Sequence, residues 1–298
     1  TEKLGYLRYW LTEHHNMPTV ISSATSILIG HVLENTQSIR VGSGGIMLPN
    51  HAPLVVAEQF GTLEAMYPKR VDLGLGRAPG TDMRTAHALR RTTQETAFAF
   101  PQDVEELQNY FKSIDQQGAV RAFPGVDAHV PIYILGSSTS SASLAARLGL
   151  PYVFAAHFAP TQLEEALHIY RNQFTPSEYL AEPHVMVCVN VVAADSNEEA
   201  EKLSTTTNRF YLNVVRRSED FLQPPVDSMD GLWSPFEESA VRGMSVYSFK
   251  GDKQAIQGQA KKFFEKFQVD ELIAVTYIYD QTARMRSYEI LKEAIDEL

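Results

Sequence analysis

The chain has 298 residues, of which 44% are hydrophobic and 21% charged, a composition typical of a globular protein with a substantial core. Its formal charge of -10, from 36 acidic and 26 basic residues, argues against nucleic-acid binding, because phosphate contacts need a concentrated basic face. A membrane-spanning helix needs about 20 consecutive apolar residues, and no apolar run in the sequence approaches that length. We therefore expect no membrane partner. The single cysteine, Cys188, lies in an apolar strand pattern and indicates a core thiol in the reducing cytoplasm.

Short β-branched runs alternate with segments of helical apolar spacing along the chain. The expected strands are 6–12, 39–48, 71–76, 131–135, 152–156, 185–193 and 272–279. The expected helices are 21–36, 52–67, most of 81–112, 140–148, 251–267, 282–298 and two that open at capping boxes beginning with Thr161 and Ser196.

Seven such strands, each followed by a helix, predict a (β/α)8 TIM barrel in a single domain over 1–298. A doubly wound open sheet is the alternative. We expect the barrel's first strand to lie upstream, because residues 1–5 resemble the last turn of a helix capped by Gly5. Residues 218–247, with several prolines, interrupt the alternation and predict an insertion that is either a lid or a packed excursion.

The ends of two strands carry side chains suited to an anion. Arg77 follows one strand among glycines, and it is either a phosphate ligand or a surface ion-pair residue. After another strand, Gly136, Ser137 and Ser138 offer hydroxyls and N–H groups at a helix N-terminus, which suits an anion or simple N-capping. A dinucleotide fingerprint is not formed here, because Pro79 stands where its third glycine would be.

Glu13, His14 and His15 end the first expected strand. Alternation places His14 on the face opposite the other two, so the three do not form one metal site, and we expect no metal. His14 could be a general acid or base, or a histidine with a structural role in a loop. In the next strand, Gly44 and Gly45 would let a flat ring or backbone come close.

Four segments together resemble the bacterial luciferase-like flavin-dependent monooxygenases, in order from about Gly5 to the C-terminus. They are Glu13-His-His15, the run Val41-Gly-Ser-Gly-Gly-Ile-Met-Leu-Pro49, Gly76-Arg-Ala-Pro-Gly80 and Pro131-Ile-Tyr-Ile-Leu-Gly-Ser-Ser138. The match is closest to the poorly characterised bacterial subgroup. Where luciferases have an acidic residue the chain has Ser137, and their tryptophan-bearing sixth strand is here 153–158, which leaves substrate and luminescence open.

The resemblance implies an FMN-dependent monooxygenase that oxidises a small organic substrate with O2 through a C4a-peroxyflavin. A separate reductase would supply the reduced FMN, and we also expect a homodimer. By position, His14 corresponds to the active-site histidine, Gly44-Gly45 to a cis peptide under the flavin ring, and Arg77, Gly136, Ser137 and Ser138 to cofactor-binding residues. The alternatives are a deazaflavin-dependent hydride-transfer enzyme on the same barrel and a flavin-binding protein without turnover. The organic substrate has no motif.

Overall fold

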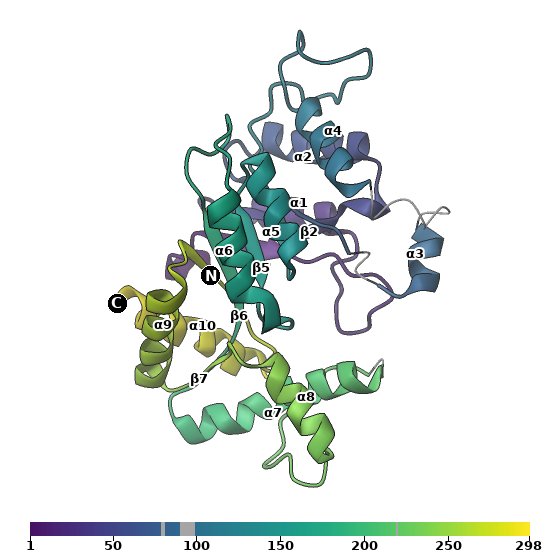
Figure 1. The fold of residues 1–298 in the computed structure, drawn as a ribbon. Helices are drawn as coiled ribbons and strands as arrows, with labels where there is room; N and C mark the ends of the chain where they lie inside the picture. Colours follow the sequence, from purple (N-terminus) through teal and green to yellow (C-terminus); the bar gives the residue numbers. More distant parts are fainter. Residues whose placement is uncertain (79–80, 90–98, 219) are drawn as a thin grey trace.

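The computed structural model describes residues 1–78, 81–89, 99–218 and 220–298 (Figure 1). Its strands are β1 (Arg8–Leu11), β2 (Arg40–Met47), β3 (Val71–Gly76), β4 (Ile132–Gly136), β5 (Tyr152–Ala155), β6 (Val185–Ala193), β7 (Phe249–Gly251) and β8 (Glu271–Val275). Its α-helices are α1 (Thr25–Glu34), α2 (Pro53–Met66), α3 (Met83–Leu89), α4 (Phe100–Tyr110), α5 (Thr139–Leu148), α6 (Leu163–Gln173), α7 (Asn197–Arg216), α8 (Pro235–Met244), α9 (Lys253–Phe267) and α10 (Gln281–Asp296).

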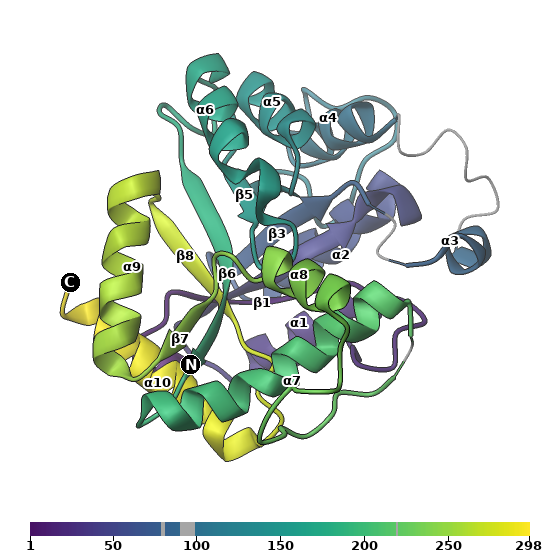
Figure 2. The ribbon, with the colours of Figure 1, turned by 60° about the horizontal axis from the view of Figure 1, so that its bottom comes forward.

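The strands form one parallel sheet that curves into an open half-barrel (Figure 2). β1 to β6 pair in chain order, β8 pairs with Met186–Asn190 of β6, and β7 pairs with Val191–Ala193 of the same strand. The predicted α/β barrel class and its seven long strands are therefore confirmed. Within the described residues, β1 and β8 each pair on one side only. β7 was not predicted, because three residues are too few to show an alternating pattern.

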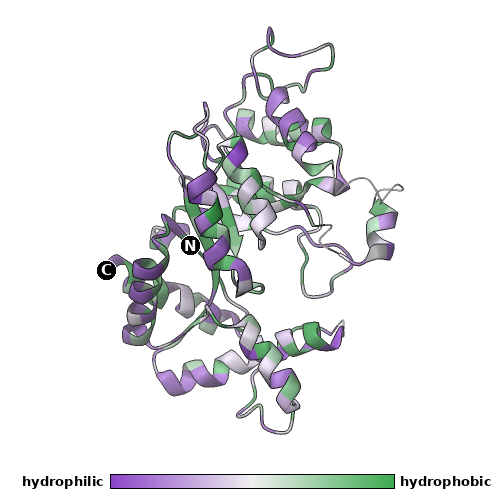
Figure 3. Ribbon diagram, in the orientation of Figure 1, coloured by the Kyte–Doolittle hydropathy of each residue, from purple (hydrophilic) through white to green (hydrophobic). Residues whose placement is uncertain are grey.

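Close contact between β2 and β3 depends on glycine. A Cβ on Gly42 would lie 2.3 Å from the Asp72 carbonyl oxygen, and one on Gly74 would lie 2.2 Å from that of Ser43. Side chains at these positions would force the strands apart. The apolar residues of the sheet instead pack outward against the helices, and Figure 3 shows the strands as largely hydrophobic and the helices as mixed.

An ion-pair network fills the N-terminal end of the half-barrel. The carboxylate of Asp72, fully buried, accepts hydrogen bonds from Arg8 (2.7 Å), Arg40 (2.5 Å) and the Trp10 indole (3.0 Å). Arg8 also forms a two-pronged ion pair with Glu271 of β8. Because a buried carboxylate is stable only when it is paired, this network fixes β1 relative to β3 and β8.

Helix starts follow the expected caps in one case and not in the other. The Ser196 hydroxyl caps α7 by accepting from the Glu199 N–H, as predicted. The box at Thr161 is wrong: Pro160 starts a 3₁₀ turn that includes Thr161, and α6 begins only at Leu163.

The predicted insertion, 218–247, contains α8, which packs on α7 through a small apolar cluster. The cluster contains Tyr211, Leu212, Met229 and Val241. In Figure 1 both helices lie at the bottom of the view, beyond the end of β6. Among the described residues, no helix is both long enough and apolar enough to cross a membrane.

Candidate functional site

Of the predicted cofactor-binding residues, Gly136 ends β4 and Arg77, Ser137 and Ser138 follow strand ends, whereas Gly44 and Gly45 lie inside β2. Gly76 pairs with Leu135, so Arg77 and Gly136 leave the sheet side by side. Arg77 is exposed, and its guanidinium forms no ion pair or hydrogen bond with any residue that the structure describes. Of the two roles predicted for Arg77, the surface ion pair has no partner among the described residues. The role of phosphate ligand stays a prediction.

Ser138 is the N-cap of α5, and its hydroxyl accepts a hydrogen bond from the Ser141 N–H. The N–H of Thr139 donates to Gln162 at 3.2 Å. Ser138 thus has the ordinary capping role that the sequence left open, while it also lies with Ser137 at the positive end of a helix that follows β4, the strand paired with β3. This grouping suits a doubly charged anion such as a phosphate ester.

The Gly44-Gly45 peptide is cis, which the family resemblance implied. It lies at an irregularity in the β2–β3 pairing, between Ser43 and Ile46. A Cβ on Gly44 would lie 3.2 Å from the Trp10 side chain. The pair lies inside β2, where Gly45 is buried and Gly44 is partly exposed.

Glu13 anchors the end of β1 while being almost fully buried. Its carboxylate accepts hydrogen bonds from His15 (2.8 Å), His51 (2.9 Å) and the Met47 N–H (2.9 Å). Burial alone would raise the pKa of Glu13, but the hydrogen bonds and the charge of His51, then the bonds of His15 and Met47, lower it below its ordinary value. Glu13 and His15 therefore share a face, as alternation predicts, and form a structural unit.

His14 acts electrostatically on a histidine that was not predicted as a site residue, His157. Burial and, to a smaller extent, the nearby charge of His14 together lower the pKa of His157 to about 4. The His157 carbonyl oxygen accepts from the Asn190 amide at 2.5 Å and from the Tyr211 hydroxyl. His157 Nδ1 is buried and has no hydrogen-bond partner among the described residues.

His157 follows the end of β5, so the rule that picked out Arg77 and Ser138 could also have found it. In the sequence, 153–158 stands out only as a departure from the family pattern. Among the residues described, no group of three or more His, Cys, Asp or Glu is arranged to hold a metal ion.

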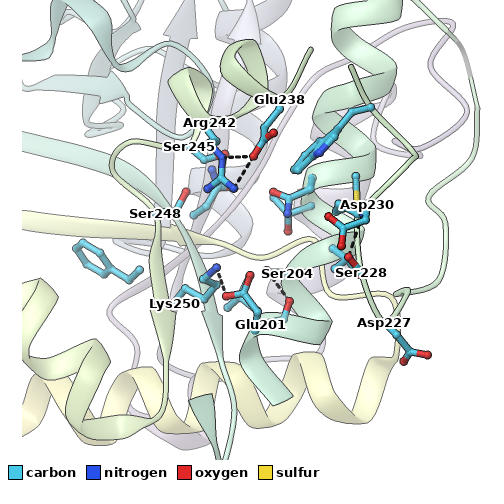
Figure 4. A pocket seen from close by; sticks show the side chains of 18 residues that line it. Glu201, Ser204, Asp227, Ser228, Asp230, Glu238, Arg242, Ser245, Ser248 and Lys250 are labelled. Carbon is cyan, nitrogen blue, oxygen red and sulfur yellow. Dashed lines mark hydrogen bonds and ion pairs between the residues drawn. The ribbon is translucent and has the colours of Figure 1, made fainter. Parts of the chain in front are cut away.

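A cavity of about 450 Å³ opens between α7, α8 and the end of β6 (Figure 4). No predicted site residue lines it, because its walls come from the segment that lacks a motif. Its charged lining residues are Glu201, Asp227, Asp230, Glu238, Arg242 and Lys250. Asn190 lines it as well and, through its amide, connects it to His157.

Comparisons with known proteins bear on the family and the fold. The model of a family described as luciferase-like monooxygenase matches residues 1–276. The uncharacterized protein YvbT of Bacillus subtilis (strain 168) is 50% identical over 98% of this chain and 87% of its own length. A luciferase-like monooxygenase of Escherichia coli (strain K12) is 48% identical over 100% of this chain and 89% of its own. The crystal structure of apo-MsnO8 has a TM-score of 0.86 at 32% identity, covering 98% of this chain and 89% of that one.

More distant proteins share the fold and differ in their cofactors. The oxygenating constituent of 3,6-diketocamphane monooxygenase from Pseudomonas putida, in complex with FMN, has a TM-score of 0.72 at 16% identity and covers 98% of this chain and 88% of its own. An F420-dependent secondary alcohol dehydrogenase has the same TM-score at 14% identity, over 99% and 92%. The oxygenase component of a flavin-dependent trigonelline monooxygenase from Acinetobacter baylyi is 20% identical over 90% of this chain and 76% of its own length.

Proposed function

Because the chain belongs to the luciferase-like monooxygenase family, we propose that it is an FMN-dependent monooxygenase which transfers one oxygen atom from O2 to a small organic substrate. Reduced FMN would supply the electrons for this reaction. The observation that supports a phosphate-bearing flavin is the pairing of Gly76 with Leu135, which brings the start of the Arg77 loop beside the strand that leads into α5. That site fits a phosphate.

The residues at the sheet edge would hold the cofactor in two places. Arg77 would bind the phosphate through charge-assisted hydrogen bonds, assisted by the hydroxyls of Ser137 and Ser138 and by the dipole of α5. Gly44 and Gly45 would lie under the ring system, with the Trp10 side chain beside Gly44. The partnerless Nδ1 of His157 is a further polar atom that a bound group could satisfy.

In this proposal, His14 is the residue that transfers protons. An imidazole exchanges protons near neutral pH, and His14 follows β1 at the same edge as Gly44 and Gly45. His157, which burial keeps uncharged at neutral pH, is the neighbouring imidazole that can accept a hydrogen bond without adding positive charge. Glu13 holds the segment in place through His51 and His15.

A reductase partner is part of the proposal. The trigonelline enzyme is named as an oxygenase component and the camphane enzyme as an oxygenating constituent, so both work with a further component. Within this chain, we assign residues to oxygenation alone and assign the reduction of flavin to a separate protein.

A deazaflavin-dependent hydride-transfer enzyme is the second candidate, because an F420-dependent dehydrogenase has the same fold. Its support is the fold alone, whereas the near relatives carry the monooxygenase name. The third possibility from the sequence, a flavin-binding protein without turnover, predicts binding with no reaction with oxygen.

One experiment separates the three functions. The protein is titrated without oxygen with reduced FMN and, separately, with reduced F420, and the loaded protein is then mixed with O2 in a stopped-flow spectrometer. We expect tight binding of FMN and a flavin absorbance transient that free FMN does not show. Preference for F420, or FMN binding with reoxidation no different from that of free flavin, would overturn the proposal.

A further inference from the structure

The cavity between α7 and α8 has an excess of hydrogen-bond acceptors. Its two cations are already paired within the wall: Arg242 with Glu238 at 2.7 Å, and Lys250 with Glu201 (Figure 4). The Asp230 carboxylate, in contrast, forms no ion pair with any residue that the structure describes. A ligand entering this cavity therefore meets an uncompensated negative charge.

The cavity wall also offers neutral hydrogen-bonding groups. Asn208, Ser228 and Ser245 line it, and their amide and hydroxyl groups donate and accept hydrogen bonds. Asn190 and Thr207 line it as well, but Asn190 Oδ1 and Thr207 Oγ1 are closed off from an entering molecule. A ligand that carries hydroxyl groups would be favoured by this wall.

An aromatic side chain completes the lining. Trp233 follows Asp230 in the loop before α8 and also lines the cavity. Indole faces attract ammonium groups, and they also stack on the apolar faces of hydroxylated rings. Acidic, aromatic and acceptor groups in one cavity point to a cationic ligand with several hydrogen-bond donors.

The cavity adjoins the residues assigned to oxygenation. Asn190 lines the cavity, and its amide N–H group donates to the His157 carbonyl at 2.5 Å and to the Tyr211 hydroxyl at 2.6 Å. His157 in turn neighbours His14. A molecule against Asn190 would thus lie one residue away from the imidazole pair.

We propose that this cavity binds the organic substrate, and that the substrate is a small ammonium-bearing molecule with hydroxyl groups; its role as substrate rests on the proposed function. A long-chain aldehyde would leave the Asp230 carboxylate without a counter-charge. A carboxylate-bearing molecule would meet like charge at Asp230, which costs affinity.

Three sugars of equal size test the charge preference: glucosamine, glucose and glucuronate. Each is titrated into flavin-free protein by calorimetry in mildly acidic buffer, in which the amine is protonated and the carboxylate ionised. We expect glucosamine to bind at least about tenfold more tightly than glucose, as one charge-assisted contact allows, and glucuronate to bind more weakly than glucose. Glucuronate binding as well as glucosamine, or no binding by any of the three, would overturn the inference.

Asp230→Asn is the matched variant, and its exposed position keeps the risk to folding low. It should abolish the advantage of glucosamine over glucose while leaving glucose binding unchanged. Asp115→Asn, an exposed aspartate in the loop after α4, should leave both affinities unchanged. An unaltered glucosamine preference in Asp230→Asn would show that the ligand is held elsewhere.

Failure of the proposed function has a different signature. The sugar titrations use no flavin and no oxygen, so they report on the cavity alone. If FMN does not bind but Asp230 still governs glucosamine binding, the cavity assignment stands and the monooxygenase assignment falls. If FMN reacts with O2 but the sugars show no charge preference, only the substrate class is wrong.

Discussion

Arg77 is the residue on which the choice of cofactor depends. If its guanidinium binds the FMN phosphate, Arg77→Ala should weaken FMN binding by about 2 kcal/mol, the typical value of a charge-assisted hydrogen bond. That is roughly a 30-fold rise in the dissociation constant. Fluorescence titration with FMN and with riboflavin measures it, and riboflavin, which has no phosphate, should lose little. Arg121→Ala, another exposed arginine, is the control.

Equal losses for FMN and riboflavin in Arg77→Ala would assign the residue to structure instead. The same comparison in Ser138→Ala is less clean, since the N-cap of α5 is lost together with the hydroxyl.

The proposed role of His14 is in the reaction and not in cofactor binding. General acid-base assistance typically contributes on the order of 10² to 10⁴ in rate, so His14→Ala should lower substrate oxygenation by at least about 10². FMN affinity should change by no more than a few-fold, because the phosphate contacts are elsewhere. Stopped-flow absorbance after mixing with O2 measures the first and equilibrium titration the second.

The control for His14→Ala is the same substitution at the adjacent histidine. His15→Ala should affect the rate less, because His15 bonds to Glu13 rather than facing His157. A His14→Ala variant that reacts like the parent, or one that merely fails to bind FMN, would remove His14 from the catalytic role.

At the scale of elements, the connection from β1 to the turn before α2 depends on Glu13. Its pKa is lower in the folded protein than its ordinary value of about 4.3. The stability gained from this carboxylate is therefore fully present above about pH 5 and is lost as the pH falls through the folded pKa. Urea unfolding of the parent and of Glu13→Gln over a series of pH values should show the difference shrinking in acid.

The direction of this effect is the test. A difference between parent and Glu13→Gln that grows in acid would contradict the lowered pKa. Glu105→Gln, on an exposed position of α4, should change the unfolding free energy by less than about 0.5 kcal/mol at neutral pH.

Elements with a long apolar period could be predicted from the sequence, and short ones could not. β6 shows nine buried residues in a row, and its pattern is evident in the chain. β7 has three residues, and it is a strand only because Phe249–Gly251 lies beside the end of β6. α1 starts at Thr25 rather than at residue 21, because Ile21 is exposed and does not belong to the apolar face.

The candidate site divides in the same way. Arg77, Gly136 and Ser138 stand next to glycines after regular strands, so their places follow from strand order. Asp230 and Trp233 line the same cavity as Asn190 only because α8 packs on α7. No local sequence pattern predicts this contact between residues far apart in the chain. The cavity was therefore beyond prediction from sequence, whereas the positions of Arg77, Gly136 and Ser138 at the strand ends were not.

For the whole molecule, Cys188 is a natural probe of global opening. It is the only cysteine, it lies on β6 between β5 and β8, and burial raises the pKa of its thiol to about 12. Because reaction requires an exposed thiolate, we expect maleimide labelling to be slow in the native protein and fast in denaturant. Mass spectrometry over time measures both rates.

Rapid labelling of native Cys188 would mean that the sheet opens locally at β6. Met186→Ala, which removes a buried side chain two residues earlier on the same strand, should accelerate labelling by destabilising the fold, and so confirms that the probe reports opening.

Along the chain, Asn190 separates the residues assigned to FMN from the residues that form the cavity. The residues assigned to FMN come from β1 to β5 and their loops, all before residue 160, whereas the walls of the α7–α8 cavity come from 190–250. Mutations in the later segment can alter which molecule is accepted without passing through the cofactor residues. A descendant of this protein could thus acquire a new substrate while it keeps the residues for oxygen chemistry. In the laboratory, exchanging 197–247 between relatives would be the most direct way to change the substrate.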